Sequence, residues 1–91
     1  MDLQYSANKI WIENKEGKTV GEVDFFQDEQ GNYDIVHTEV DDSLRGQGAA
    51  GRLVQAAADY IRSTGHQTKA SCSYASRWFM RHKDYSDIYL P

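Results

Sequence analysis

The chain has 91 residues, of which 40% are hydrophobic and 12% aromatic, so it can form one domain with a thin core and is too hydrophobic to be disordered. It carries 10 Lys and Arg against 14 Asp and Glu, a formal net charge of −4, which argues against general nucleic-acid binding. The single cysteine excludes an intramolecular disulfide, and together with three scattered histidines it gives none of the spacings of a zinc site, so no metal is expected.

Apolar runs are short throughout the chain. None approaches the roughly 18 residues of a membrane-spanning helix, and the sequence shows no secretory signal, low-complexity tract or internal repeat. We therefore expect a single domain over residues 1–91, located in the cytoplasm, with no membrane or nucleic-acid partner.

The first half of the chain predicts three strands. Residues 9–13 read as a strand, and the tight turn at 14–17 leads into a second strand at 19–26, which makes a hairpin. A turn at 28–32 precedes residues 33–40, which are rich in β-branched side chains and nearly alternating, so they complete an antiparallel meander. Alternation along this third strand places four side chains on one face, namely Tyr33, Ile35, His37 and Glu39.

The second half predicts a helix, a strand and a helix. The first helix begins near Gly48 and stops at Gly65. Residues 66–72 form a weaker strand, predicted because the chain must return to the sheet, and by pattern they could equally be a loop. A last helix starts at about Tyr74 with Ser73 as its N-cap. The buried stripes are expected at Leu53, Ala57, Tyr60 and Ile61 on the first helix and at Ala75, Trp78, Phe79 and His82 on the second. The order βββαβα belongs to the α/β class.

Residues 44–51, Leu-Arg-Gly-Gln-Gly-Ala-Ala-Gly, join the third strand to the first helix. The first turn of a helix has four backbone N–H groups without intrahelical partners, and the macrodipole adds partial positive charge there. Glycines remove side chains that would keep a ligand from these amides, and the turn offers no capping side chain beyond Asp42 and Ser43. The loop therefore predicts a phosphate site whose ligand caps the helix.

Two common phosphate loops are excluded by their spacing. A P-loop requires Lys-Ser or Lys-Thr after its last glycine, whereas Gly48 is followed by two alanines. Gly46, Gly48 and Gly51 satisfy G-x-G-x-x-G literally, but a strand ending in an acidic residue does not follow, and 91 residues cannot supply a Rossmann sheet.

What remains, Arg45-x-x-Gly48-x-Ala50, resembles the Q/R-x-x-G-x-G/A signature of the GNAT superfamily of N-acetyltransferases. Further segments fall in the order and spacing of a subgroup of small, stand-alone predicted acetyltransferases, over roughly residues 5 to 90; they are His37-Thr38-Glu39-Val40, Cys72-Ser73-Tyr74 and Trp78-Phe79-Met80-Arg81-His82. The chain departs from this subgroup at Ala70 and Lys83, where members often have proline, and Ala50 replaces the second loop glycine of the superfamily.

This resemblance implies a truncated GNAT-like fold that binds acetyl-CoA and transfers the acetyl group to an amine of unknown identity. The pair of helices that usually follows the first strand is missing, which implies an open groove, a large or partner-supplied substrate, or a homodimer that closes the site. Two alternatives are a non-catalytic CoA or acyl-CoA binding module and an interaction scaffold with an empty loop. The residues implied to hold the cofactor are Val40, Arg45, Gly46, Gln47, Gly48, Ala49, Ala50 and Tyr74.

Three residues are candidates for catalysis. Cys72 is predicted at a strand end, beside a helix N-terminus and near Lys69 and Arg77, an electropositive setting in which its side chain could act as an acyl-accepting nucleophile or as a general acid toward the CoA sulfur. The alternative is that Cys72 packs as a small hydrophobe. His37, with Glu39 two residues along, lies on the strand from which GNAT enzymes often present a base, although both can equally be ordinary sheet residues.

Net charge is divided unevenly between the two halves of the chain. Residues 1–44 carry 3 Lys and Arg against 11 Asp and Glu, or −8, whereas residues 45–91 carry 7 against 3, or +4. Either the two halves attract each other across the fold, or the second half faces a polyanionic ligand such as the phosphates of CoA.

Overall fold

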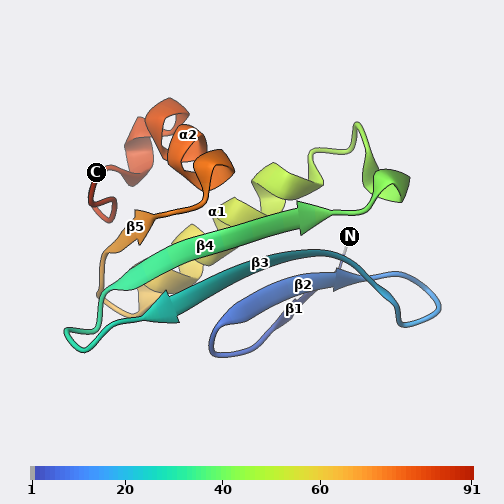
Figure 1. The fold of residues 1–91 in the computed structure, drawn as a ribbon, viewed down its shortest axis with the longest axis horizontal. Coiled ribbons are helices and arrows are strands. Elements are labelled where there is room, and N and C mark those ends of the chain that lie inside the picture. The colour runs from blue at the N-terminus through green and yellow to red at the C-terminus, as the bar shows by residue number, and fades with distance from the viewer. Residues whose placement is uncertain (1) are drawn as a thin grey trace.

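The computed structural model describes residues 2–91 as a five-stranded sheet with one helix across it and a second helix at its edge (Figure 1). The sheet order is β1-β2-β3-β4-β5, in which the first four strands are antiparallel neighbours and β5 runs parallel to β4. The elements are β1 (Leu3–Tyr5), β2 (Lys9–Glu13), β3 (Thr19–Gln27), β4 (Tyr33–Val40), η1 (Asp42–Leu44), α1 (Ala49–Ser63), β5 (Thr68–Ala70), α2 (Ser73–Arg81) and η2 (Lys83–Tyr85). The predicted meander, helix, strand and helix are confirmed.

Two local features differ from the sequence prediction. The short strand β1 pairs with β2 through Leu3↔Ile12 and adds an edge to the meander, and three residues are too few for an alternating pattern to reveal it. The N-cap of α2 is Cys72, with extended backbone angles, and Ser73 is already the first helical residue, so the predicted N-cap was wrong by one position.

A β-bulge in β4 sets which side chains face the helices. Between the pairs Asp24↔His37 and Phe25↔Ile35, β3 advances by one residue and β4 by two, so Val36 is the extra residue. Beyond a bulge the alternation of side chains shifts by one position. Ile35 is fully buried, whereas half of the His37 side chain is exposed. The predicted common face was therefore wrong, because Tyr33 and Ile35 lie on the core side and His37 and Glu39 on the other.

The core lies between α1 and one face of the sheet. Leu53, Ala57 and Ile61 recur at helical spacing and have no exposed surface, as the stripe predicted. At Gly21 of β3 a Cβ atom would lie 3.3 Å from the side chain of Leu53, so glycine lets the helix approach the sheet closely. Figure 1 shows α1 behind β4 and, within residues 2–91, no helix over the opposite face of β2 to β4. Neither helix is both long and apolar enough to cross a bilayer.

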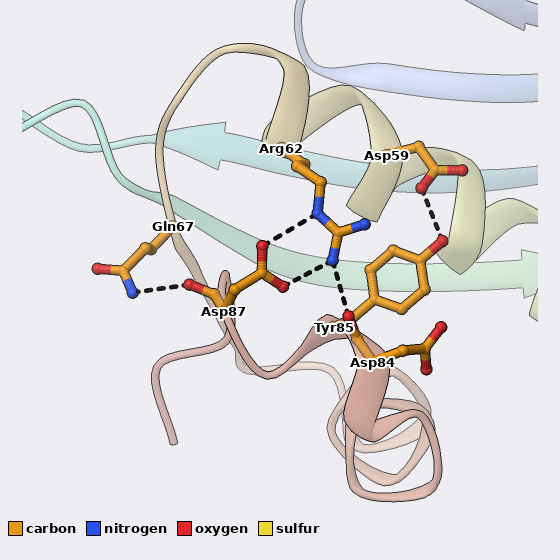
Figure 2. Close-up of polar contacts among 6 residues, drawn as sticks. All are labelled: Asp59, Arg62, Gln67, Asp84, Tyr85 and Asp87. Atoms are coloured by element: carbon orange, nitrogen blue, oxygen red, sulfur yellow. Dashed lines mark hydrogen bonds and ion pairs between the residues drawn. The ribbon is translucent and has the colours of Figure 1, made fainter.

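The C-terminal segment is held against α1 by a polar network (Figure 2). Arg62 on α1 donates from Nη2 to Asp87 Oδ1 at 2.6 Å and from Nε to Asp87 Oδ2 at 3.1 Å, and its guanidinium lies 4.4 Å from the ring centre of Tyr85. The Tyr85 hydroxyl donates to Asp59 Oδ1 at 2.7 Å. These contacts fix the chain after α2, and so help to hold α2 beside α1.

We expect Asp87→Asn to lower the melting temperature at neutral pH, and the difference from the parent protein to disappear on acidification. Hydrogen bonds from Arg62 hold the pKa of the Asp87 carboxyl below its ordinary value of 3.8. Such a group stabilises the fold above the unfolded-state pKa, and this contribution is lost as the pH falls through the lowered folded-state pKa. Thermal melts from pH 7 down to about pH 2 test the effect. Asp84→Asn is the control, because Arg62 contacts the backbone carbonyl of Asp84. A difference for Asp87→Asn that does not change with pH contradicts the prediction.

Candidate functional site

The loop after β4 turns on two glycines in left-handed backbone conformation. Gly46 has φ +80° and Gly48 has φ +71°, a region that L side chains rarely adopt. A Cβ atom placed on either residue would meet nothing within 4 Å. The space outside the loop is therefore open at the two positions where the sequence removes side chains.

The start of α1 has no side-chain cap. Its N-cap is Gly48, and the first helical bond runs from the Arg52 N–H to the Gly48 carbonyl at 3.1 Å, so the amides of residues 49–51 precede it. The Asp41 carboxylate accepts from the Ser43 N–H at 2.9 Å and caps η1 instead. Hydrogen bonds from Ser43 lower the pKa of Asp41. The predicted capless helix start is confirmed.

The polar side chains of the loop turn back onto η1. Arg45 donates from Nη2 to Asp42 Oδ1 at 3.0 Å and is 80% exposed, and Gln47 donates from Nε2 to the Ser43 carbonyl at 3.5 Å. Leu44 is partly buried against the core and anchors the loop. The Gln47 N–H donates to the Leu44 carbonyl at 3.2 Å, so what this loop offers to a ligand is its other backbone amides.

A groove of about 350 Å³ lies between the first turns of α1 and one face of α2. Tyr74 and Trp78 approach α1 closely, since a Cβ on Gly51 would lie 3.5 Å from the Tyr74 hydroxyl and 3.9 Å from Trp78 Nε1. The Tyr74 hydroxyl thus lies beside Gly51, the last residue of the glycine-rich segment 44–51. The rest of the groove is lined by Gly48, Arg52, Gln55, Arg77, Arg81 and His82.

Sequence reasoning did not assign Arg52 and Arg81 to this site. Arg52 comes from α1 and Arg81 from the end of α2, and the pattern of each helix does not reveal how the two helices meet. The excess of positive charge in residues 45–91 was the available signal, and the structure gathers part of that charge at the predicted phosphate loop.

Cys72 lies where β5 separates from β4. The β4–β5 ladder ends at Ile35↔Ala70, followed by one bond from the Cys72 N–H to the Ile35 carbonyl at 3.0 Å, while β4 continues to Val40. The half-buried thiol donates to Thr38 Oγ1 at 3.5 Å. Of the two expected cationic neighbours, Arg77 lines the groove and Lys69 lines a separate hollow beside Phe26.

His37 and Glu39 form a pair on the open face of the sheet. His37 Nε2 lies 3.2 Å from Glu39 Oε1, and the two side chains are 50% and 73% exposed. If the carboxylate accepts a hydrogen from Nε2, then Nδ1 of the neutral ring is the free acceptor. The bulge at Val36 thus places this pair on the face away from α1, while Thr38 points toward Cys72.

His37 also adjoins two carboxylates of β3. Ligand atoms of Glu22, Asp24 and His37 lie within 4.8 Å of one another, an arrangement that the sequence did not predict and that could hold a cation. Lys9 Nζ already lies 3.5 Å from Glu22 and 3.8 Å from Asp24, so an ammonium group supplies positive charge there. Burial, with Glu22 as a second cause, raises the pKa of Asp24.

Several solved structures share this fold. A GCN5-like protein from Staphylococcus aureus is 29% identical, with a TM-score of 0.80 over 98% of this chain and 87% of that one. YhbS, a GNAT family N-acetyltransferase from Escherichia coli in complex with CoA, is 28% identical, with a TM-score of 0.62 over 84% of this chain and 48% of that one. GCN5 from Tetrahymena is 17% identical, with a TM-score of 0.65 over 80% and 48%, and is similar in fold alone.

Residues 9–88 match the family model of the GCN5-related N-acetyl-transferases. This range contains β2 to β5, both helices, the glycine loop and the groove. A comparison with curated proteins gave no match. The family model covers most of the chain. The chain therefore belongs to the GCN5-related N-acetyltransferase family and is an acetyl-CoA-dependent acetyltransferase.

Proposed function

We propose that residues 1–91 form a single domain that binds the pyrophosphate of acetyl-CoA on the amides of residues 46–50 and transfers the acetyl group to an amine. The observation that supports this most directly is the uncapped start of α1 at Gly48, which opens onto a groove lined by arginines. Backbone N–H groups at a helix N-terminus favour an anion through their own hydrogen bonds and through the macrodipole.

The residues present fit such a ligand. The loop amides donate hydrogen bonds, and the open space beyond Gly46 and Gly48 admits a phosphate without steric conflict. In this proposal the amides of Ala49 and Ala50 complete the anion site, Arg45 and Gln47 hold the loop, and Tyr74 walls the groove. Val40 ends β4 at the point where the loop begins. When bound, acetyl-CoA supplies an activated acetyl thioester.

The catalytic groups lie on two sides of the gap between β4 and β5. Cys72, at the start of α2, contacts Thr38 of β4 on one side, whereas His37 and Glu39 face the open side of the sheet. We propose that an acceptor amine approaches from the open side, where His37 Nδ1 can accept its proton, with Glu39 orienting the imidazole. The Cys72 thiol, next to a helix N-terminus without a side-chain cap, acts as nucleophile or as proton donor.

If Cys72 is a nucleophile, incubation with acetyl-CoA and no acceptor leaves an acetyl group on the protein. The Cys72 sulfur then bonds to the acetyl carbon, the bond from that carbon to the CoA sulfur breaks, and the thiol proton goes to the released CoA. Digestion and mass spectrometry should place this acetyl group on Cys72 as a thioester that hydroxylamine removes. If Cys72 only donates a proton, Cys72→Ser slows transfer and the parent protein carries no adduct.

The variant Cys72→Ala tests whether the thiol takes part in the reaction or only packs as part of the fold. We expect it to lose transfer activity while keeping CoA binding, at a modest cost in stability, because the half-buried thiol has one hydrogen-bond partner, Thr38. Thr38→Val is the matched control, since it removes that partner and keeps the thiol. Full activity in Cys72→Ala would contradict a catalytic role and leave direct attack by the amine as the mechanism.

A transfer screen tests the function as a whole. Purified protein is incubated with acetyl-CoA and with amines, polyamines, protein N-termini or lysine peptides, and the released CoA thiol is measured. We expect acceptor-dependent release with at least one class. Binding of CoA without release in any mixture would favour a non-catalytic CoA-binding module.

A further inference from the structure

We propose that the groove beside the loop recognises the 3′-phosphate of CoA, and that Arg77 and Arg81 distinguish CoA from 3′-dephospho-CoA. This inference rests on the proposed binding of the pyrophosphate by residues 46–50. It adds a second phosphate contact, made by side chains, next to the contact made by backbone amides.

Three guanidinium groups border the groove. Arg77 and Arg81 are four residues apart on α2 and therefore project from the same side of that helix, while Arg52 lies in the first turn of α1 across from them. Of the described residues that line the groove, none is Asp or Glu. Cations gathered without a counter-ion repel one another, and a multiply charged anion between them turns this repulsion into attraction.

These arginines differ from two others in the same chain. Arg45 is paired with Asp42 at 3.0 Å and Arg62 with Asp87 at 2.6 Å. For the three arginines of the groove, no ion pair with a carboxylate is formed within residues 2–91. Their side chains are consequently available to a ligand.

The chemistry of the groove matches a phosphate monoester. Such a group carries about −1.5 to −2 charges at neutral pH, and its oxygens accept paired hydrogen bonds from guanidinium groups. A volume of about 350 Å³ is small for a binding site and suits one end of a long ligand. His82 stacks on Trp78 with ring centres 4.0 Å apart and gives the groove a planar wall. With the pyrophosphate held by the loop, the 3′-phosphate is the remaining charged group of CoA.

Calorimetric titration with CoA and with 3′-dephospho-CoA tests the inference. We expect the parent protein to bind CoA at least about tenfold more tightly, the effect of one charge-assisted contact. The double variant Arg77→Gln/Arg81→Gln should bind both ligands equally, with its affinity for 3′-dephospho-CoA unchanged. Both side chains are exposed, so the fold should persist, which a thermal melt checks. The matched control, Lys69→Gln/Lys83→Gln, removes the same charge outside the groove and should keep the preference.

The outcomes separate this inference from the proposed function. Equal affinity of the parent protein for both ligands overturns the inference and leaves CoA binding in place. An equal loss of affinity for both ligands in the arginine double variant also overturns it, because the arginines would then contact a part of the molecule that the two ligands share. Loss of the preference in the lysine control assigns the effect to overall charge and overturns it as well. If neither ligand binds the parent protein, the proposed function fails, and this inference fails with it.

Discussion

Gly48→Val should abolish the stabilisation of the protein by CoA. A ligand at a hundredfold excess over its dissociation constant stabilises a fold by about 2.7 kcal/mol when it binds the native state alone, which for a domain of this size raises the melting temperature by about 10–20 °C. The valine side chain would enter the open space beyond the loop, where the proposal places the phosphate. We therefore expect no shift in melting temperature with millimolar CoA.

The substitution Gly48→Val also strains the backbone, and a second glycine of the chain serves as a control for this strain. At φ +71° a β-branched residue is strained, at a cost of at least about 1–2 kcal/mol whether or not a ligand binds. Gly17 has φ +80°, and a Cβ atom added there would also meet nothing within 4 Å, but this glycine lies in the turn between β2 and β3. Gly17→Val should lower the melting temperature similarly and keep the full CoA shift. A CoA shift that survives in Gly48→Val would contradict the proposed pyrophosphate site.

His37→Ala should lower turnover by about 10²-fold or more, the usual range for a lost general base, with CoA affinity nearly unchanged. His37 is half exposed and lies away from the arginine-lined groove, so its removal should leave cofactor binding intact. Steady-state kinetics with an acceptor found in the screen, and calorimetry with CoA, measure the two effects separately.

Two further variants show whether the effect belongs to this imidazole. Glu39→Gln keeps the size of the partner and removes its charge, so it should slow turnover less than His37→Ala does. His66→Ala removes a histidine that is hydrogen-bonded to Thr64 at the far end of α1, and it should keep full turnover. Equal turnover in His37→Ala and the parent protein would make His37 an ordinary sheet residue.

The strands and helices could be predicted because their signals are local. The alternation in residues 33–40 and the stripe of Leu53, Ala57 and Ile61 each lie within one element. The bulge at Val36 could not be predicted in this way, because it is defined by the pairing of β4 with β3. That single residue decides on which side of the sheet His37 lies. The sequence could therefore identify His37 as a candidate base, but not the face of the sheet that it occupies.

The loop of the candidate site could be predicted from the sequence, whereas the contacts between residues far apart in the chain could not. Gly46 and Gly48 indicate a left-handed turn before a helix, which the structure contains. The contact of Cys72 with Thr38 joins residues 34 positions apart, and no spacing along the chain reveals it. Arg81 becomes part of the groove through the packing of α2 against α1. The roles of Cys72, His37 and Glu39 stay predictions that the experiments above test.

The position of β5 in the sheet has a consequence for the order of folding. Strands β1 to β4 are neighbours both in sequence and in the sheet, so their pairing closes only short loops. In contrast, β5 meets β4 only after the whole of α1, and its other edge is met by Tyr89 near the end of the chain. Contacts of such high sequence separation are slow to form, because a long loop must be closed before they are made. The groove therefore forms only when the last third of the chain is docked on the meander, since α2 supplies one of its walls.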